Sequence, residues 1–147
     1  METVSSKQPF HLLLIEDNLP DIVLLQKAIE RCGKQPFLHV VRDGEEAMMF
    51  LRKEGKYSEA VRPNLILLDI NLPKKSGYEV LHEIKQDERL KSILVIVLTS
   101  SSAETDAYKS RQYCADSHLV KPCSLNEYIQ MVNRLEKFWT ETTSILR

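Results

Sequence analysis

Four apolar runs in this chain are each followed directly by a polar side chain with a use in phosphate or metal chemistry. The runs and the residues after them are Leu12–Ile15 with Glu16 and Asp17, Leu65–Leu68 with Asp69, Ile93–Leu98 with Thr99, and the weaker His118–Val120 with Lys121. Runs of this length are typical of buried strands. Because the carboxyl ends of parallel strands meet at one edge of a sheet, we expect these polar groups to lie together.

The acidic members of this set predict a divalent-cation site. Three carboxylates in a small space raise one another's pKa unless a cation neutralises them. Magnesium prefers oxygen ligands, keeps several waters and usually takes one or two carboxylates. We therefore predict Mg²⁺, with Mn²⁺ as a substitute, held by Glu16, Asp17, Asp69 and the backbone carbonyl of Asn71.

The other polar groups suit phosphoryl transfer to Asp69. An ionised, exposed aspartate is a nucleophile that forms an aspartyl phosphate. Lys121 would pair with Asp69 or with phosphoryl oxygens, Thr99 would donate a hydroxyl hydrogen bond, and the small Ser100 would leave room for the group to enter. Each residue alone is explained by an ordinary cap or turn. The four strand ends together predict a phosphoacceptor site at Asp69.

The elements that must position these groups alternate between strands and helices. A fifth apolar run, Leu38–Val41, completes a set of five predicted strands, and unbroken apolarity favours parallel strands covered on both faces. A helix is predicted from Asn18 to Gly33 by its cap, Pro20 and an apolar stripe. Capping-box spacings predict four more helices, at Asp43/Glu46, Ser76/Glu79, Ser101/Glu104 and Ser124/Glu127. The pattern predicts an α/β fold with a doubly wound parallel sheet, and a surface loop over Lys53–Pro63.

Composition excludes several classes of protein. The 147 residues are enough for one domain with a sizeable core, and a net charge of −1 without a basic block argues against a nucleic-acid partner. No apolar run is long enough to cross a bilayer, and no secretory signal is visible. Three scattered cysteines (Cys32, Cys114, Cys123) are expected to be free thiols. We expect a cytoplasmic protein without a membrane partner.

The motifs around these groups resemble the response-regulator receiver family. The segments are LLLIEDN, LILLDINLPKKSGYEVL, VLTSS and HLVKP, and the resemblance spans about Phe10 to Phe138. It implies a flavodoxin-like (βα)5 fold with strand order 2-1-3-4-5, and a cis Lys121–Pro122 bond. It also implies that Asp69 takes a phosphoryl group from a histidine kinase, that Thr99 and the residue at position 118 act as switch residues, and that the protein is no enzyme beyond self-phosphotransfer and slow self-dephosphorylation.

A finer resemblance concerns the kinase. The segments IEDNLPDIVLLQKA, DINLPKKSGYEVL and IKQDERLKSILVIVLTSS are similar to the small stand-alone regulators that partner cyanobacterial phytochrome kinases. A phytochrome histidine kinase is therefore the implied partner, and the protein would be a component of light signalling.

Two positions depart from the family pattern. Glu16 stands where Asp is more frequent, and its extra methylene could turn a direct metal contact into a water-bridged one. His118 stands where the family commonly has Tyr or Phe as a rotating switch residue. Its imidazole either fills that role, with a pH dependence near neutrality, or is a half-exposed strand histidine.

The last helix carries more large apolar residues than one stripe requires. We divide the chain into a tail (1–9), a receiver domain (10–139) and a helix end or tail (140–147). Because this division contains no DNA-binding or catalytic module, we expect the signal to be passed on through protein contacts. Exposed apolar residues usually mark an interface. We predict a homodimer through this helix and the neighbouring face of the last strand and the helix before it, using Tyr128, Met131, Leu135, Phe138 and Trp139. The alternative is that these residues cover the domain's own core.

Three other functions compete with a phosphorylation switch. A haloacid-dehalogenase-type phosphatase needs a second acid two residues after the nucleophile, where this chain has Asn71. A flavin carrier needs a phosphate-cradling loop after the first strand, where this chain has the acidic EDNLPD. The third is a phosphorylation-independent scaffold or dimerisation module; against it, every expected position of the phosphoacceptor site is filled by a residue with workable chemistry.

Overall fold

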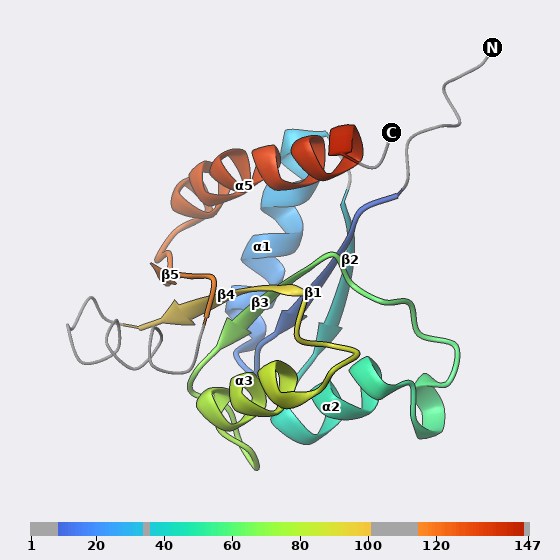
Figure 1. Cartoon of the computed structure of the whole chain (residues 1–147). Coiled ribbons are helices and arrows are strands. Elements are labelled where there is room, and N and C mark those ends of the chain that lie inside the picture. The colour runs from blue at the N-terminus through green and yellow to red at the C-terminus, as the bar shows by residue number, and fades with distance from the viewer. Residues whose placement is uncertain (1–8, 34–35, 101–114, 146–147) are drawn as a thin grey trace.

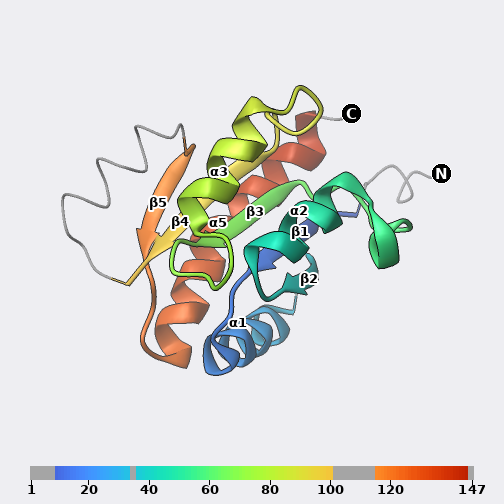
Figure 2. The same cartoon turned by 90° about the horizontal axis from the view of Figure 1, so that it is seen from below.

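The fold is built on a parallel sheet of five strands. The structure, a computed structural model, describes residues 9–33, 36–100 and 115–145, with side chains as far as Phe138. The strands are β1 (His11–Ile15), β2 (Phe37–Val41), β3 (Leu65–Asp69), β4 (Leu94–Thr99) and β5 (Ser117–Val120). Their order is β2-β1-β3-β4-β5, and Figure 2 shows β5 and β2 at opposite edges. The predicted α/β parallel fold and its strand order are confirmed.

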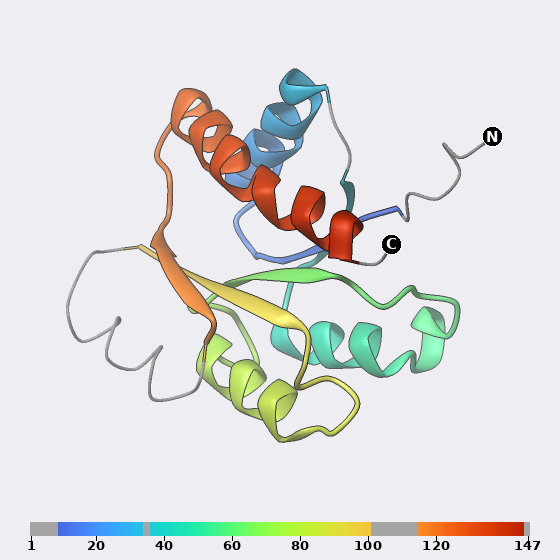
Figure 3. The same ribbon diagram turned by 45° about the horizontal axis from the view of Figure 1, so that its top comes forward.

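Helices cover both faces of the sheet. They are α1 (Leu19–Cys32), α2 (Gly44–Arg52), α3 (Gly77–Gln86) and α5 (Leu125–Ile145), with a 3₁₀ turn, η2 (Gly55–Tyr57), inside the predicted surface loop. α1 and α5 lie on one face, and α2 and α3 on the other (Figures 1 and 3). The helix predicted from Ser101/Glu104 lies outside the described residues. Within the described part of the chain, no helix is long and apolar enough to cross a membrane.

The predicted caps set the helix boundaries. The side chain of Asn18 accepts a hydrogen bond from the Asp21 amide at 3.0 Å, and Gly33, with φ of 66°, ends α1 in the left-handed conformation. Ser76 and Glu79 form a complete capping box at the start of α3, with distances of 3.2 and 2.9 Å. These boundaries fix how far each loop at the sheet edge extends.

Alternate strand residues fill two separate cores. Towards α2 and α3 the strands contribute Leu13, Ile15, Ile66, Leu68, Val95 and Val97. Towards α1 and α5 they contribute Leu12, Leu14, Leu65, Leu67, Ile96 and Leu98. Every residue of β3 is buried, which is why Leu65–Leu68 are apolar without alternation before the strand ends at Asp69.

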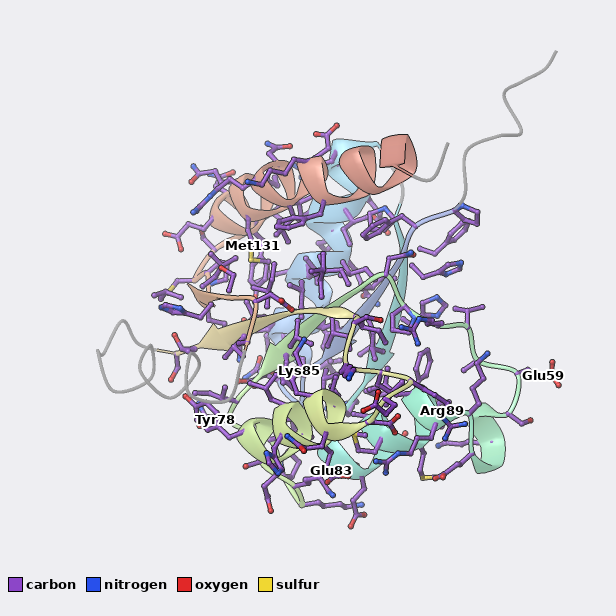
Figure 4. All side chains as sticks on the ribbon, viewed as in Figure 1. Glu59, Tyr78, Glu83, Lys85, Arg89 and Met131 are labelled. Carbon is purple, nitrogen blue, oxygen red and sulfur yellow. The ribbon has the colours of Figure 1, made fainter. Side chains whose placement is uncertain are left out.

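The large residues of α5 belong mainly to the second core. Tyr128, Met131 and Leu135 are only 2–3% exposed, and Figure 4 shows Met131 between α5 and the sheet. The prediction that these three side chains form an exposed interface is wrong: α5 packs against both the sheet and α1, so its apolar stripe is wide. Phe138 is half-buried against the same core, and the side chain of Trp139 lies outside the described side chains.

Lys85 joins α3 to the beginnings of two strands. Its ammonium donates to the carbonyls of Lys91 and Ile93 and to Asp116, each at 3.2 Å. Asp116 also accepts the amide of Val95 at 2.7 Å. Figure 4 shows Lys85 between α3 and the sheet, so one side chain holds together the amino ends of β4 and β5.

Two further features lie at the other edge and at the end of β5. His11 Nδ1 of β1 lies 2.9 Å from His39 Nε2 of β2, a hydrogen bond between two rings.

The prediction of a cis Lys121–Pro122 bond is wrong. This peptide bond is trans, as are the other peptide bonds of the described residues. The trans form is favoured by about 0.5–1 kcal/mol even before proline.

Candidate functional site

Three of the predicted residues meet at the carboxyl edge of the sheet. Glu16 directly follows β1, Asp69 ends β3, and Lys121 directly follows β5. The Lys121 ammonium lies 3.0 Å from Glu16 Oε1 and 3.3 Å from Asp69 Oδ2. Residues that are separated by 52 and 105 positions therefore share one charged cluster.

Asp69 is held by a partner at each carboxylate oxygen. Its Oδ1 accepts the amide of Asn71 at 3.0 Å, and its Oδ2 faces Lys121. The residue is only 3% exposed, so the expectation of an exposed Asp69 is wrong. The cause is its place at the end of the central strand β3, between the ends of β1 and β4. These fixed contacts leave the carboxylate aligned rather than free to rotate.

Glu16 is a buried carboxylate with an unsatisfied oxygen. It is 1% exposed, and its Oε2 accepts the Asn18 amide at 3.0 Å. Its Oε1 has no hydrogen-bond partner, although the Lys121 ammonium is near it. Burial and the neighbouring Asp69 carboxylate raise the pKa of Glu16 to about 7. The Glu16–Asp69 pair therefore has too little compensating positive charge.

The oxygen donors at this edge fit a hydrated hard cation. Two buried carboxylates, one with an unsatisfied oxygen, match the one or two carboxylates that magnesium usually takes beside its waters. The third predicted carboxylate, Asp17, has an exposed side chain. Among the described residues no three Asp, Glu, His or Cys side chains form a ready metal cluster. The site thus suits an ion that retains water more than one enclosed by protein.

Asp21 and Tyr128 belong to the same charge cluster, although the sequence did not single them out for it. Asp21 Oδ2 lies 3.1 Å from the Lys121 ammonium, and its Oδ1 accepts the Tyr128 hydroxyl at 3.0 Å. Burial and the Asp21 charge raise the pKa of Tyr128, so its hydroxyl remains a donor. The acidic loop EDNLPD is the signal that could have pointed to Asp21.

Lys121 stays charged despite its partial burial. Burial alone would lower its pKa, but the hydrogen bond with Glu16 and the charge of Asp69 raise it instead. An ammonium with three acidic neighbours is a permanent positive charge at physiological pH. It is the feature that keeps this edge of the sheet from being purely acidic.

The two predicted switch residues lie on neighbouring strands. Thr99 ends β4 and is fully buried, and its carbonyl accepts the Lys121 amide at 2.6 Å. His118 is half-buried on β5, in register with Val97 of β4. Asn71 reaches towards the residue after β4, with 3.5 Å between its Nδ2 and Ser100 Oγ.

Gly77 allows α3 to begin directly against the end of β3. A Cβ atom at this position would lie 2.4 Å from the Cα of Ile70 and 2.6 Å from the carbonyl oxygen of Asp69. Only glycine fits so close to the backbone of the acidic strand end. The start of α3 therefore determines where the Asp69 main chain lies.

The sequence matches one protein family over most of its length. Residues 12–133 match the response regulator receiver domain. The chain belongs to this family. The site described above occupies the strand ends of that receiver domain, and the assignment made from the four sequence motifs is confirmed.

The receiver domain has relatives among phytochrome regulators. Response regulator Rcp1 of Synechocystis sp. is 44% identical over 140 residues, which cover 95% of either chain. A crystal structure of the Mn²⁺-bound form of Rcp1 matches with a TM-score of 0.81 at 45% identity, over 91% of this chain and 96% of the other. The phosphorylated cyanobacterial phytochrome response regulator RcpA matches with a TM-score of 0.84 at 44% identity, over 92% and 96%. The finer resemblance to phytochrome regulators is confirmed.

Proposed function

We propose that this receiver domain is a phosphorylation switch whose phosphoryl group is carried by Asp69. The observation that carries the proposal is the Lys121 ammonium, 3.3 Å from Asp69 Oδ2, while the Asn71 amide holds Asp69 Oδ1. This arrangement aligns a nucleophilic oxygen beside a cation that can follow the arriving phosphoryl oxygens. A relative at 44% identity has been crystallised in phosphorylated form, which supports the same role here.

We propose that a divalent cation, Mg²⁺ or Mn²⁺, binds at Glu16, Asp17, Asp69 and the Asn71 carbonyl. The unsatisfied Glu16 Oε1 and the Mn²⁺-bound form of the relative Rcp1 support this set. When bound, the cation would neutralise phosphoryl oxygens. Asp17, exposed beside buried Glu16, is suited to a contact through water, and the longer Glu16 side chain can also reach the ion that way.

The proposed transfer is one covalent step rather than turnover of a substrate. An Asp69 oxygen attacks phosphorus, the bond from phosphorus to the kinase histidine breaks, and the aspartyl phosphate is later hydrolysed slowly. Lys121 would contact the new phosphoryl oxygens, and the Thr99 hydroxyl would follow them inward. His118, on the adjacent strand, would respond as the second switch residue. The protein would thus signal rather than catalyse.

We propose a phytochrome-type histidine kinase as the donor and a second copy of the chain as an output partner. The names of the relatives support the kinase class. The dimer would form through the exposed side of β5 and α5, because Tyr128, Met131 and Leu135 are buried in the chain's own core. Val120 is 49% exposed there, beside a hollow of about 520 Å³ whose lining includes His118, Pro122, Gln130 and Arg134.

The phosphoacceptor role is tested by intact mass measurement after incubation with acetyl phosphate and Mg²⁺. The wild type should gain a single phosphate, and Asp69→Asn should gain none. Asp87→Asn is the matched control, because it removes another aspartate charge far from Lys121, and it should react like the wild type. Chelation of Mg²⁺ should abolish the adduct.

Other outcomes would identify the competing functions. An unmodified wild type would favour the phosphorylation-independent scaffold. Continuous release of phosphate from a phosphoester would favour a phosphatase. An equal adduct on Asp69→Asn would reject Asp69 as the acceptor.

A further inference from the structure

The two carboxylate oxygens of Asp21 contact different partners. Asp21 lies in the first turn of α1, and its Oδ2 is 3.1 Å from the Lys121 ammonium. Its Oδ1 accepts the hydroxyl of Tyr128, on α5, at 3.0 Å. One side chain of α1 therefore connects the cation of the phosphoacceptor site with α5, the helix that packs against α1 over the second core.

Lys121 is divided among three acids, of which Asp21 is the one outside the strand ends. Its distances are 3.0 Å to Glu16, 3.1 Å to Asp21 and 3.3 Å to Asp69. An ammonium has three N–H donors, so each acid can engage one of them. Loss of the Asp21 charge would shift the ammonium towards the other two carboxylates. The position of the Lys121 ammonium therefore depends on its attraction to Asp21 as well as to Glu16 and Asp69.

Tyr128 keeps Asp21 in this position. The side chain of Asp21 is 19% exposed and could otherwise turn towards solvent, whereas Tyr128 is 2% exposed in the core between α5 and α1. A buried tyrosine ring has little rotational freedom, so its hydroxyl is a fixed donor. The bond holds Asp21 beside Lys121.

We propose that Asp21 is a positioning residue for Lys121 in phosphoryl transfer, and that the Tyr128 hydroxyl fixes Asp21 and so links the position of Lys121 to α5. The inference rests on the phosphoacceptor role proposed above. A phosphoryl group brings a charge of about −1.5 to −2 and draws the ammonium towards it. Asp21 then loses its share of Lys121, and the bond to Tyr128 passes this change to α5.

The first test is the rate at which acetyl phosphate modifies the full chain. In this reaction the bond from phosphorus to the acetate oxygen breaks as the Asp69–phosphorus bond forms, with no gain or loss of protons or electrons. Asp21→Asn preserves shape and an oxygen acceptor for Tyr128, but removes the charge. We expect roughly threefold to tenfold faster adduct formation, because a charge that competes for Lys121 and repels the anionic donor is gone.

Further variants separate positioning from simple stability. Tyr128→Phe should give a smaller acceleration, because Asp21 is released without losing its charge. It should add nothing in the Asp21→Asn background, because the hydroxyl acts only through the carboxylate. Glu30→Gln neutralises an exposed acid on the same helix, and Tyr57→Phe removes a hydroxyl bonded to another carboxylate, Glu46. Both controls should react at the wild-type rate.

The second test observes Lys121 directly. The NMR signal of its ammonium nitrogen should shift in Asp21→Asn and in Tyr128→Phe, but in neither control. A purely structural role would lower the melting temperature without moving this signal or the rate. A wild-type rate together with an unmoved signal would overturn the inference. If the wild type takes no phosphate, the phosphoacceptor proposal fails instead, and the ammonium signal still decides whether Asp21 positions Lys121.

Discussion

Glu16 and Asp69 are nearly buried neighbours, and two carboxylates in that position destabilise each other unless a cation is shared between them. Lys121 supplies one positive charge, which leaves Glu16 Oε1 unsatisfied. The excess of negative charge on Glu16 and Asp69 that destabilises the pair also favours the binding of a divalent cation. The capacity of the site to bind such an ion therefore depends on the two carboxylates being only partly neutralised by Lys121.

We predict that Gly77→Ala damages the site through the backbone. The added methyl group would meet the main chain of Ile70 and Asp69, so the end of β3 must shift. We expect a loss of about 1–3 kcal/mol in the free energy of unfolding, typical of overpacking, and slower adduct formation at Asp69. Urea unfolding and intact mass measurement would show both.

Ser76→Ala is the control for this variant. It removes the cap of the same helix and should cost about 1 kcal/mol, yet leave the rate of adduct formation unchanged. Equal rates in Gly77→Ala and the wild type would contradict the close-approach argument.

Some site residues could be predicted from the sequence and others could not. Glu16, Asp69 and Lys121 each come at the end of an apolar run, so local pattern and the parallel sheet place them together. Asp21 and Tyr128 are 107 positions apart, and their bond depends on how α1 packs against α5. No local pattern records which residues of two helices face each other. The burial of Asp69 could not be predicted for a similar reason, because it follows from the strands on either side of β3.

At the scale of elements, α5 shows how a wide apolar stripe can be misinterpreted. A helix that covers only a sheet needs one narrow stripe, but α5 also packs against α1. Its additional apolar residues are therefore core residues. The strands and the caps were easier to predict, because apolar runs and capping residues act within a few positions of each other.

We predict opposite effects for a buried and an exposed residue of this region. Met131→Ala should cost about 2–5 kcal/mol in the free energy of unfolding, yet leave the sedimentation coefficient of the folded protein unchanged.

Val120→Glu should leave stability nearly unchanged but convert a dimer to a monomer, because it places a charge in the proposed contact. A monomeric wild type would reject the dimer.

In the whole molecule, the residues that stabilise the fold and the residues proposed for signalling lie in different places. Each core lies on one face of the sheet, and the charged cluster lies at the carboxyl edge that they share. At the opposite, amino end of the sheet, Lys85 and Asp116 hold the beginnings of β4 and β5. A change at the phosphoacceptor edge can therefore reposition side chains while the far end of the sheet remains fixed.

The close contact between His11 and His39 makes the stability of the molecule sensitive to acid, because His39 is partly buried beside a second imidazole. Burial and the nearby His11 lower the pKa of His39 below its usual 6.5. Below about pH 6.5 the unfolded chain therefore binds more protons at this position than the folded one, so the free energy of unfolding should fall as the pH falls. Above pH 6.5 the contribution is fully present.

Urea unfolding at pH 7.5 and 5.5 would measure this loss. His39→Gln should lose less stability between the two pH values than the wild type, whereas His82→Gln, on the exposed side of α3, should lose as much. An identical loss in all three proteins would contradict the assignment. Since β2 is an edge strand, we expect the protection of its amide hydrogens, measured against the slower intrinsic exchange of an unprotected amide in acid, to fall first. A mildly acidic medium would thus loosen this edge of the sheet while β3, which carries the phosphoacceptor, stays protected.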